Sequence, residues 1–489
     1  MNKFKAEKGL RMNIIIKIPH VVEKYAPYYE ALFSEEGYEY FRRYLSGLIL
    51  SEKKTVEAIN RLFVISPRNQ SSFNRFLNRQ NFSIVDLENR NIDLMQQTQD
   101  TAFKIAQGNS GVLSLDDTLL SHYGKHIEHI EHIEHIYNMW DDVYNHYTMA
   151  HNLVSLPYSD DKTDYPIYHT LWEPPDWDLV AQKMQDLSIH VNPQKWESRK
   201  EDVKKWRNYI HDRYKDYQYK RPELQEVYKT KIFNGLDMLR RFQQNYPHLN
   251  LPVALDGGYT SAGSCEIIDK ELKMAYVGSL TATQIIISEK DERMTLDQFK
   301  DKLLAQHQAG DTKFFKTTIH YKKIAKSYLA YWGTHRINGY TDKQRLVIAF
   351  GYEDFRDTPW FTISNRTHWH ASGILRIRRH RWPIEIFHQE GKDEGLDKYQ
   401  LRHFTAIRTH VAFVSVAYTM LKRAIHDEEL MSVFRQSVLG KEADGTLPLL
   451  RRWLEIDELA ALVEIVFLNT QKGLTLPQIN QQLIEPLFS

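Results

Sequence analysis

Four carboxylates, in three stretches far apart in the sequence, are of the type that holds divalent cations. Asp116 and Asp117 follow the apolar run Gly-Val-Leu-Ser-Leu, and Asp256 follows Leu-Pro-Val-Ala-Leu ahead of a Gly-Gly turn. Glu385 lies in the stretch Arg-Trp-Pro-Ile-Glu-Ile-Phe-His. Taken singly, each is an ordinary turn residue or a member of a surface ion-pair ladder. Together, one acid from each stretch makes the set that two hard cations need to clamp the attacking and leaving oxygens of a phosphodiester.

Each of these acids is expected at the end or on the face of a regular element. The apolar runs predict buried strands, over 112–116 and up to Asp256, which deliver acids to the carboxyl edge of a sheet. Strand alternation sends Asp116 and Asp117 to opposite faces, so only one is a primary ligand. We prefer Asp116 and keep Asp117 as the alternative. Residues 383–394 have the pattern of a helix whose first turn begins with a proline.

Cationic side chains accompany the glutamate on that predicted helix. Arg381, Glu385, His388 and Lys392 recur at steps of three and four, so they share one face. An arginine presents a planar fork and a lysine a compact point charge, and both suit phosphate. We expect His388 and Trp382 to pack beside the ligands and support them, with Trp382 as an apolar anchor of the helix.

The spacing R-x3-E-x6-K at Arg381, Glu385 and Lys392 resembles the signature of bacterial insertion-sequence transposases of the DDE class. In this group, the insertion-sequence-four superfamily, a tyrosine three residues before the arginine completes a Tyr-Arg-Glu-Lys motif. Arg378 stands there in this chain, which is a departure from the pattern. Asp-Asp-Thr at 116–118 also matches the group, and the resemblance covers roughly residues 35–425.

The resemblance implies an RNase H-like catalytic domain that carries out DNA strand transfer. Its metal ligands would be Asp116, Asp256 and Glu385, holding two Mg²⁺ ions for which Mn²⁺ substitutes. Its partners would be double-stranded DNA, both transposon ends and target, and a second copy of the chain in a homodimer assembled on that DNA. The residues that would contact phosphate near the metals are Arg378, Arg381 and Lys392.

The first 105 residues are mostly helical in pattern. A polar turn over 66–72 precedes a helix that carries Arg75 and Arg79, which suggests a helix-turn-helix-like DNA reader. Packing of three helices with no ligand is the alternative. The resemblance to transposase N-terminal domains, which bind transposon ends, favours DNA.

The expected fold class is an α/β core of RNase H-like type, a mixed sheet flanked by helices, with a β-rich insertion and helical regions at both ends. The His-Ile-Glu repeat covers residues 126–135. A period of three residues drifts around a helix and alternates between the faces of a strand, so its histidines do not form a compact metal cage. We interpret the repeat as a surface loop. The predicted units are a helical DNA-binding domain (1–105), the first part of the core (106–283), the insertion (284–355), the second part of the core (356–425) and a helical tail (426–489).

The composition and charge of the chain restrict its class and its partners less closely than the motifs do. The net charge is only +1, but residues 195–241 hold 14 Lys/Arg against 8 Asp/Glu, a local excess suited to phosphates or simply a solvated helical face. The single Cys265 excludes an internal disulfide and a cysteine-based zinc site. With neither a signal peptide nor a membrane span evident, we expect a cytoplasmic bacterial protein, associated with the nucleoid when bound to DNA, and no membrane partner.

The sequence therefore predicts a transposase that binds terminal inverted repeats, cleaves DNA at the element ends and joins the 3′-OH ends to target DNA. Two alternatives stay open: a transposase-derived DNA-binding protein that no longer cleaves, and a metal-dependent nuclease without strand transfer. The phosphate-binding loop of ATPases is not evident in the sequence, so ATP use is not implied.

Overall fold

The computed structural model describes residues 14–63, 68–79, 81–96, 111–122, 132–322, 324–436 and 446–481. The first part of the His-Ile-Glu repeat and the predicted boundary at residues 105–106 lie outside these ranges.

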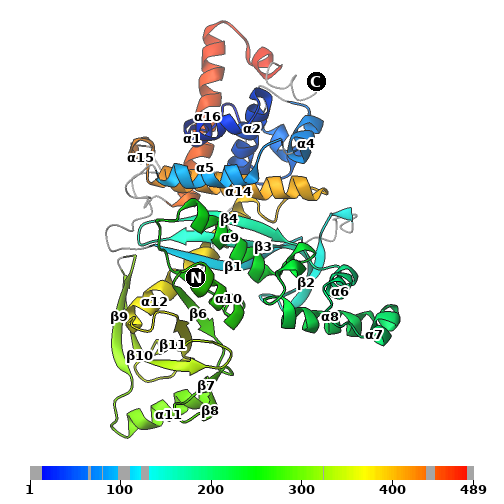
Figure 1. Ribbon diagram of the computed structural model, residues 1–489. Helices are drawn as coiled ribbons and strands as arrows, with labels where there is room; N and C mark the ends of the chain where they lie inside the picture. The colour runs from blue at the N-terminus through cyan, green and yellow to red at the C-terminus, as the bar shows by residue number, and fades with distance from the viewer. Residues whose placement is uncertain are drawn as a thin grey trace, which may run out of the picture.

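A mixed sheet of twelve strands runs through the molecule (Figure 1). Its central part has the order β4-β3-β1-β5-β6. β1, β3 and β4 form an antiparallel meander, whereas β5 and β6 continue from β1 in parallel. The predicted strand over 112–116 is confirmed as β1 and continues to Ser121, and the strand that ends before Asp256 is confirmed as β5. The hairpin of β2 with β3 was not predicted. The strands are β1 (Val112–Ser121), β2 (Tyr137–Asp141), β3 (His146–Ser159), β4 (Asp164–Trp172), β5 (Val253–Leu255) and β6 (Tyr276–Leu280).

The segment predicted as a β-rich insertion extends this same sheet. β12 (Trp360–Ser364) pairs with β6 on one side and with β11 (Gln344–Phe350) on the other. The sheet then continues through β10 (Ile324–Ile337), which also pairs with β9 and β7. The remaining elements of this part are β7 (Ile285–Ile287), β8 (Arg293–Thr295), α11 (Leu296–Gln308) and β9 (Phe315–Tyr321).

Helices cover both faces of the central strands. On one face lies α9 (Lys231–Asn245), whose buried Phe233, Leu236 and Phe242 join the core formed by β1, β3 and β5. α13 (Trp382–Glu394) contacts β1, β3 and β4 and packs against α14 (Phe404–Ile425). α14 is long and apolar enough to cross a membrane, but 83% of its most apolar window is buried inside the protein. It serves as the central helix of a core.

The helices from the two ends of the chain share that core. Apolar residues of the N-terminal helices form a single cluster with α14 and with the C-terminal helices, and Figure 1 shows both groups on the same side of the sheet. The N-terminal helices are α1 (His20–Tyr25), α2 (Glu35–Leu50), α3 (Val56–Arg61), α4 (Gln70–Arg79) and α5 (Ile84–Gln96); the C-terminal helices are α15 (Glu428–Gln436) and α16 (Leu447–Gln471).

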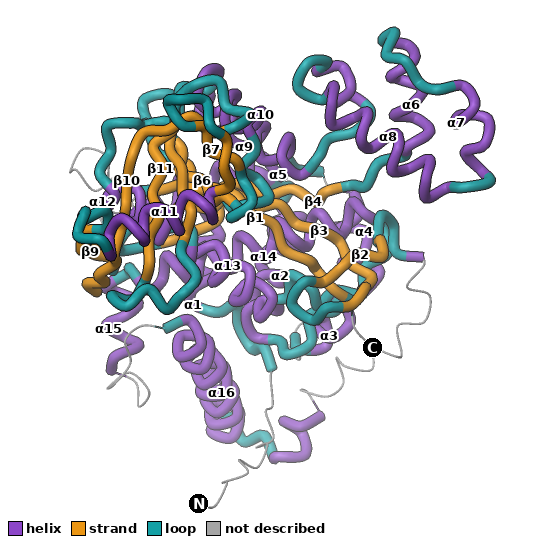
Figure 2. Tube along the Cα trace, turned by 90° about the horizontal axis from the view of Figure 1, so that it is seen from below, coloured by secondary structure: helices purple, strands orange, loops and turns teal. Residues whose placement is uncertain are grey.

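Residues 174–230, here called the helical insert, separate β4 from α9. α6 (Trp177–Asp186) packs against α8 (Val203–Tyr217) around a small core of its own that includes Trp206 and Ile210. With the short α7 (Pro193–Glu197), these helices project to one side of the sheet in both Figure 1 and Figure 2. A 3-10 turn, Pro222–Glu226, leads from α8 towards α9.

Candidate active site

The parallel register of β1 and β5 brings two of the predicted acids together. Leu115 is paired with Leu255, so Asp116 and Asp256 follow at equivalent positions on neighbouring strands. Neighbouring strands lie about 4.8 Å apart, which places the two carboxylates at one edge of the sheet. After Asp256 the chain turns back at once, and its carbonyl oxygen accepts hydrogen bonds from the backbone and side chain of Thr260.

α13 supplies the third acid. Pro383 lies in its first turn, as predicted, and Ile384 and Phe387 are buried. Because these apolar residues anchor the helix, Glu385 is left at the edge of the packed face, and its side chain is 39% exposed.

The guanidinium of Arg381 lies among the three carboxylates. Its Nη1 is 2.7 Å from Asp116 Oδ2 and 3.9 Å from Asp256 Oδ1. Its Nη2 donates to Glu385 Oε1 at 2.6 Å. Acids separated by up to 269 residues therefore converge on a single side chain, which is the spatial arrangement that the sequence predicts.

Asp116 carries a perturbed acidity. Burial raises the pKa of Asp116 to about 7, and the negative charges of Asp256 and Asp117 add to this, while Arg381 opposes it. A carboxyl in such surroundings gains from any further cation brought beside it.

Asp117 points away from this cluster. Its Oδ2 accepts hydrogen bonds from Lys231 Nζ at 2.8 Å and from Asn152 Nδ2 at 2.6 Å, and its Oδ1 accepts one from the Tyr259 hydroxyl at 2.9 Å. Burial would raise the pKa of Asp117, but these partners outweigh it and the pKa is lowered. Lys231 and Asn152 were missed in the sequence, where neither has a motif that links it to an acid so far along the chain.

The donor set fits a hard cation in chemistry, because Asp116, Asp256 and Glu385 offer only carboxylate oxygens. Among the described residues, no three His, Cys, Asp or Glu side chains are close enough to hold one metal ion between them. Arg381 takes the central position instead. These acids could hold a cation once that guanidinium has turned away.

Two of the predicted companions lie near the cluster. Arg378 stacks on Trp360, with 3.9 Å between its guanidinium and the ring centre. Burial and, to a smaller extent, the charge of Arg381 lower the pKa of Arg378 to about 10, against the opposing effect of Asp256. His388 is buried, which lowers its pKa to about 3, and within the described structure its Nε2 has no hydrogen-bond partner.

Of the two other companions on α13, Trp382 departs from expectation. Trp382 is 48% exposed, so its predicted role as an apolar anchor was wrong. The helix is rotated such that Ile384 and Phe387 face the core, and the nearest cation to the Trp382 ring is the guanidinium of Arg379, 5.8 Å from its centre. Lys392 is half-buried and makes no ion pair with a described carboxylate of the cluster.

Arg75 and Arg79 lie on α4, apart from the carboxylates. Both line a cavity of about 310 Å³ between α2 and α4, together with Tyr40 and Phe76. Arg75 donates a hydrogen bond to Ser72 at 2.9 Å. The two predicted DNA contacts therefore share one surface of the N-terminal helices.

Comparison with known protein families places the chain in a superfamily. Residues 28–298 match the model of the DDE superfamily endonucleases. The chain belongs to this superfamily. No curated protein matches it.

Members of the DDE superfamily are nucleases and transposase-type enzymes that act on DNA and generally use divalent metal ions. The matched range contains Asp116, Asp117 and Asp256 but ends well before Arg381 and Glu385. The place of Glu385 in the cluster therefore depends on the packing of α13, independently of the family match.

Proposed function

We propose that this DDE endonuclease is a transposase of the insertion-sequence-four superfamily. It binds the terminal inverted repeats of its element, cleaves DNA at the ends and joins the 3′-OH ends to target DNA. The observation that carries the proposal is the convergence of Asp116, Asp256 and Glu385 on Arg381.

The topology supports an RNase H-like core. An antiparallel meander of β4, β3 and β1 is followed by the parallel strands β5 and β6, with acids on the first strand and directly after β5. A later helix, α13, then adds Glu385. This is the arrangement implied by the resemblance of the signature helix to the transposase motif.

In the proposed mechanism Asp116, Asp256 and Glu385 would hold two Mg²⁺ ions, for which Mn²⁺ would substitute. Bound ions would lower the pKa of an attacking water or 3′-hydroxyl and neutralise the departing oxygen. Arg381 holds the carboxylates together through its two Nη atoms, and it must release them for cations to bind. Its planar fork is then available to a phosphate oxygen of the DNA strand.

The remaining cations are assigned to DNA by their positions. Arg378 neighbours Arg381 and would add positive charge where a phosphate approaches, although its stacking on Trp360 leaves it a supporting role. Lys392 would meet a phosphate farther along α13. Arg75 and Arg79 would read the terminal repeat from the surface of α4.

Cleavage tests the proposal directly. The purified protein is incubated with DNA that carries the ends of its element, in Mg²⁺ or in EDTA, beside the Glu385→Gln variant. We expect cleavage that requires the metal and is lost in the variant. Binding without cleavage under every condition would instead indicate a DNA-binding derivative.

Joining is tested separately. A pre-cleaved end with a free 3′-OH is supplied with circular target DNA, and joined products are sought on a gel. Products identify a transposase, whereas cleavage without joined products identifies a nuclease. The homodimer on DNA and the cytoplasmic location belong to the same proposal; the first is checked by light scattering of the complex with two ends.

A further inference from the structure

A row of aromatic rings leads from the buried side of Asp117 into the helical insert. Trp172, at the end of β4, lies beside Lys231, the ion-pair partner of Asp117, with 5.9 Å between its ring centre and Lys231 Nζ. The Trp172 ring centre is 6.5 Å from that of Tyr228, and Tyr228 is 5.7 Å from Trp177. Trp177 is followed by His211 on α8, at 5.5 Å.

These rings line a cavity of about 540 Å³, here called the inner cavity. Trp172, Tyr228, Trp177 and His211 are all only partly buried, so they present ring surface to the opening. Cavities of about 300–1,000 Å³ with aromatic walls are typical of sites for small organic groups. Asp117, Lys231, Gly258, Tyr259, Arg207, Asn208 and Thr230 complete much of the wall.

The charge of the inner cavity favours an anionic partner. Arg207 is exposed on α8, and no described carboxylate pairs with it. The one carboxylate of the lining, Asp117, is already neutralised by Lys231. With Lys231 paired to Asp117, Arg207 is left as the cation of the inner lining that can meet a phosphate beside a base.

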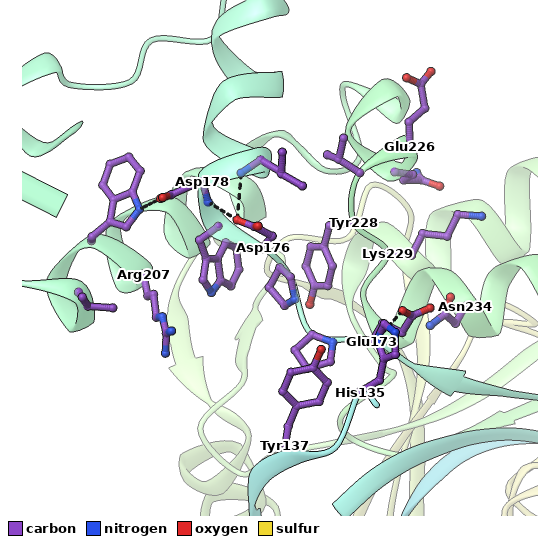
Figure 3. A pocket seen from close by; sticks show the side chains of 18 of the residues that line it. His135, Tyr137, Glu173, Asp176, Asp178, Arg207, Glu226, Tyr228, Lys229 and Asn234 are labelled. Carbon is purple, nitrogen blue, oxygen red and sulfur yellow. Dashed lines mark hydrogen bonds and ion pairs between the residues drawn. The ribbon is translucent and has the colours of Figure 1, made fainter. Parts of the chain in front are cut away.

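An adjoining outer cavity differs in charge. It shares Pro174, Pro175, Trp177, Arg207 and Tyr228 with the inner cavity. Figure 3 shows side chains of its wall, with Arg207 and Tyr228 among residues that include several carboxylates. The acidic lining residues are Glu173, Asp176, Asp178 and Glu226. Four cations of the same lining, Arg199, Lys200, Arg207 and Lys229, balance these acids, whereas the inner lining has two cations against one carboxylate. An anionic ligand is therefore favoured in the inner cavity.

We propose that the inner cavity binds unpaired nucleotides of the DNA strand engaged at the carboxylates, with the bases on the Trp172–Tyr228–Trp177 rings and a phosphate on Arg207. This rests on the proposed action on DNA, and it adds a binding site formed by the helical insert. Base stacking on aromatic rings tolerates any sequence, since every base has a π-face. An apolar peptide is a poorer fit, because the lining also holds Arg207 and Lys231.

The test measures binding without cleavage. The full chain in EDTA is titrated into a fluorescein-labelled oligodeoxythymidine of about eight nucleotides, a length within the range bound by single-strand sites. We expect Trp177→Ala and Arg207→Glu each to weaken binding by roughly tenfold or more. Lys204→Glu is the matched control: it makes the same kind of charge change on α8, at an exposed residue outside the lining, and should alter binding by less than twofold.

Two further measurements make the result specific. Trp177→Phe keeps a ring and should recover most of the binding lost in Trp177→Ala, which separates stacking from damage to the fold. Photocrosslinking of a 5-iodouracil oligonucleotide, mapped by mass spectrometry, should label Trp172, Trp177 or Tyr228.

Three outcomes would overturn the inference: unchanged binding in both Trp177→Ala and Arg207→Glu, equal losses in Lys204→Glu, or crosslinks only outside the helical insert. Failure of the proposed catalysis is distinct from these. Glu385→Gln would then cleave no differently from the parent protein, while oligonucleotide binding in EDTA could still respond to Arg207→Glu.

Discussion

The two faces of strand β1 carry adjacent aspartates in opposite circumstances. The side chains of Asp116 and Asp117 are almost equally covered, with 18% and 20% exposed. The carboxylate of Asp117 accepts hydrogen bonds from Lys231, Asn152 and Tyr259. Asp116 shares one guanidinium with two other carboxylates.

Partners, rather than burial, therefore distinguish the two acids. The pKa of Asp117 is lowered because Lys231 and the hydrogen-bond donors around it stabilise the carboxylate. The pKa of Asp116 is raised to about 7 because burial and the neighbouring acids disfavour its negative charge more than Arg381 stabilises it. A carboxylate with a full set of partners, such as Asp117, stabilises the fold, whereas one whose negative charge is only partly stabilised, such as Asp116, can bind a further cation. This favours Asp116 as the primary ligand and gives Asp117 a role in positioning.

The largest expected effect separates the two aspartates by activity. Asp116→Asn should reduce cleavage by roughly three orders of magnitude, because loss of several kcal/mol of charge stabilisation costs tenfold per 1.36 kcal/mol. Single-turnover cleavage of end DNA measures it, with circular dichroism as the check on folding. If Asp117→Asn were the more damaging of the two, the assignment of the primary ligand would be reversed.

Replacing the shared guanidinium should have the next largest effect. Arg381→Lys keeps the charge but loses the fork that spans Asp116 and Glu385, so cleavage should fall about a hundredfold. In Arg381→Ala the carboxylates lose their internal cation, and the Mn²⁺ concentration for half-saturation should decrease. Calorimetric titration with Mn²⁺ reports this; weaker Mn²⁺ binding would show that Arg381 does not compete with cations.

Asp117→Asn should act mainly on stability. It weakens a hydrogen-bonded ion pair with Lys231 that is partly screened by solvent, so the free energy of unfolding should decrease by about 1–2 kcal/mol. Urea denaturation measures the loss, and cleavage of the remaining folded protein should stay within tenfold of the parent. A stability equal to that of the parent would contradict the structural role given to Asp117.

Buried histidines should make the folded protein less stable at acidic pH, which limits the pH range in which the variants can be compared. Burial lowers the pKa of both His410 and His122 to about 4, against 6.5 for an exposed imidazole. Below pH 6.5 the unfolded chain takes up protons that the folded chain refuses until about pH 4. Each such histidine should therefore cost roughly 1.4 kcal/mol of stability per pH unit as the pH falls across that window.

Thermal unfolding between pH 7 and pH 5 measures this loss. His410→Gln should flatten the pH dependence, since a glutamine does not titrate there. An unchanged slope would mean that other groups dominate the acid sensitivity.

The sequence allowed the acids to be found, because strand ends and helix faces are local patterns. Apolar runs predicted β1 and β5, and the parallel register between them then follows from packing. The orientation of α13 was only half predicted: helical spacing grouped Arg381 with Glu385 but could not tell that Trp382 faces solvent. That depends on how α13 contacts α14 and the sheet.

The partners of Asp117 and the row of aromatic rings in the inner cavity could not be predicted either, because they too depend on tertiary packing. Lys231 reaches Asp117 across 114 residues, and Tyr228 meets Trp172 only because the helical insert folds back on β4. The excess of cations over 195–241 indicated a basic region, yet it did not show which cations face the site. Such contacts are fixed by tertiary packing, which leaves no periodic trace in the sequence.

The helices from the two ends of the chain pack into one core, and this has a consequence for the distance along DNA between the recognised base pairs and the cleaved bond. α4, with Arg75 and Arg79, contacts α14, and α14 contacts α13, which bears Glu385. Under the proposed function, the surface that recognises the repeat and the acid that cuts are joined by packed helices instead of a tether. The spacing between recognised base pairs and cut is then set as by a rigid ruler. Inserting base pairs between them should abolish cutting rather than shift it.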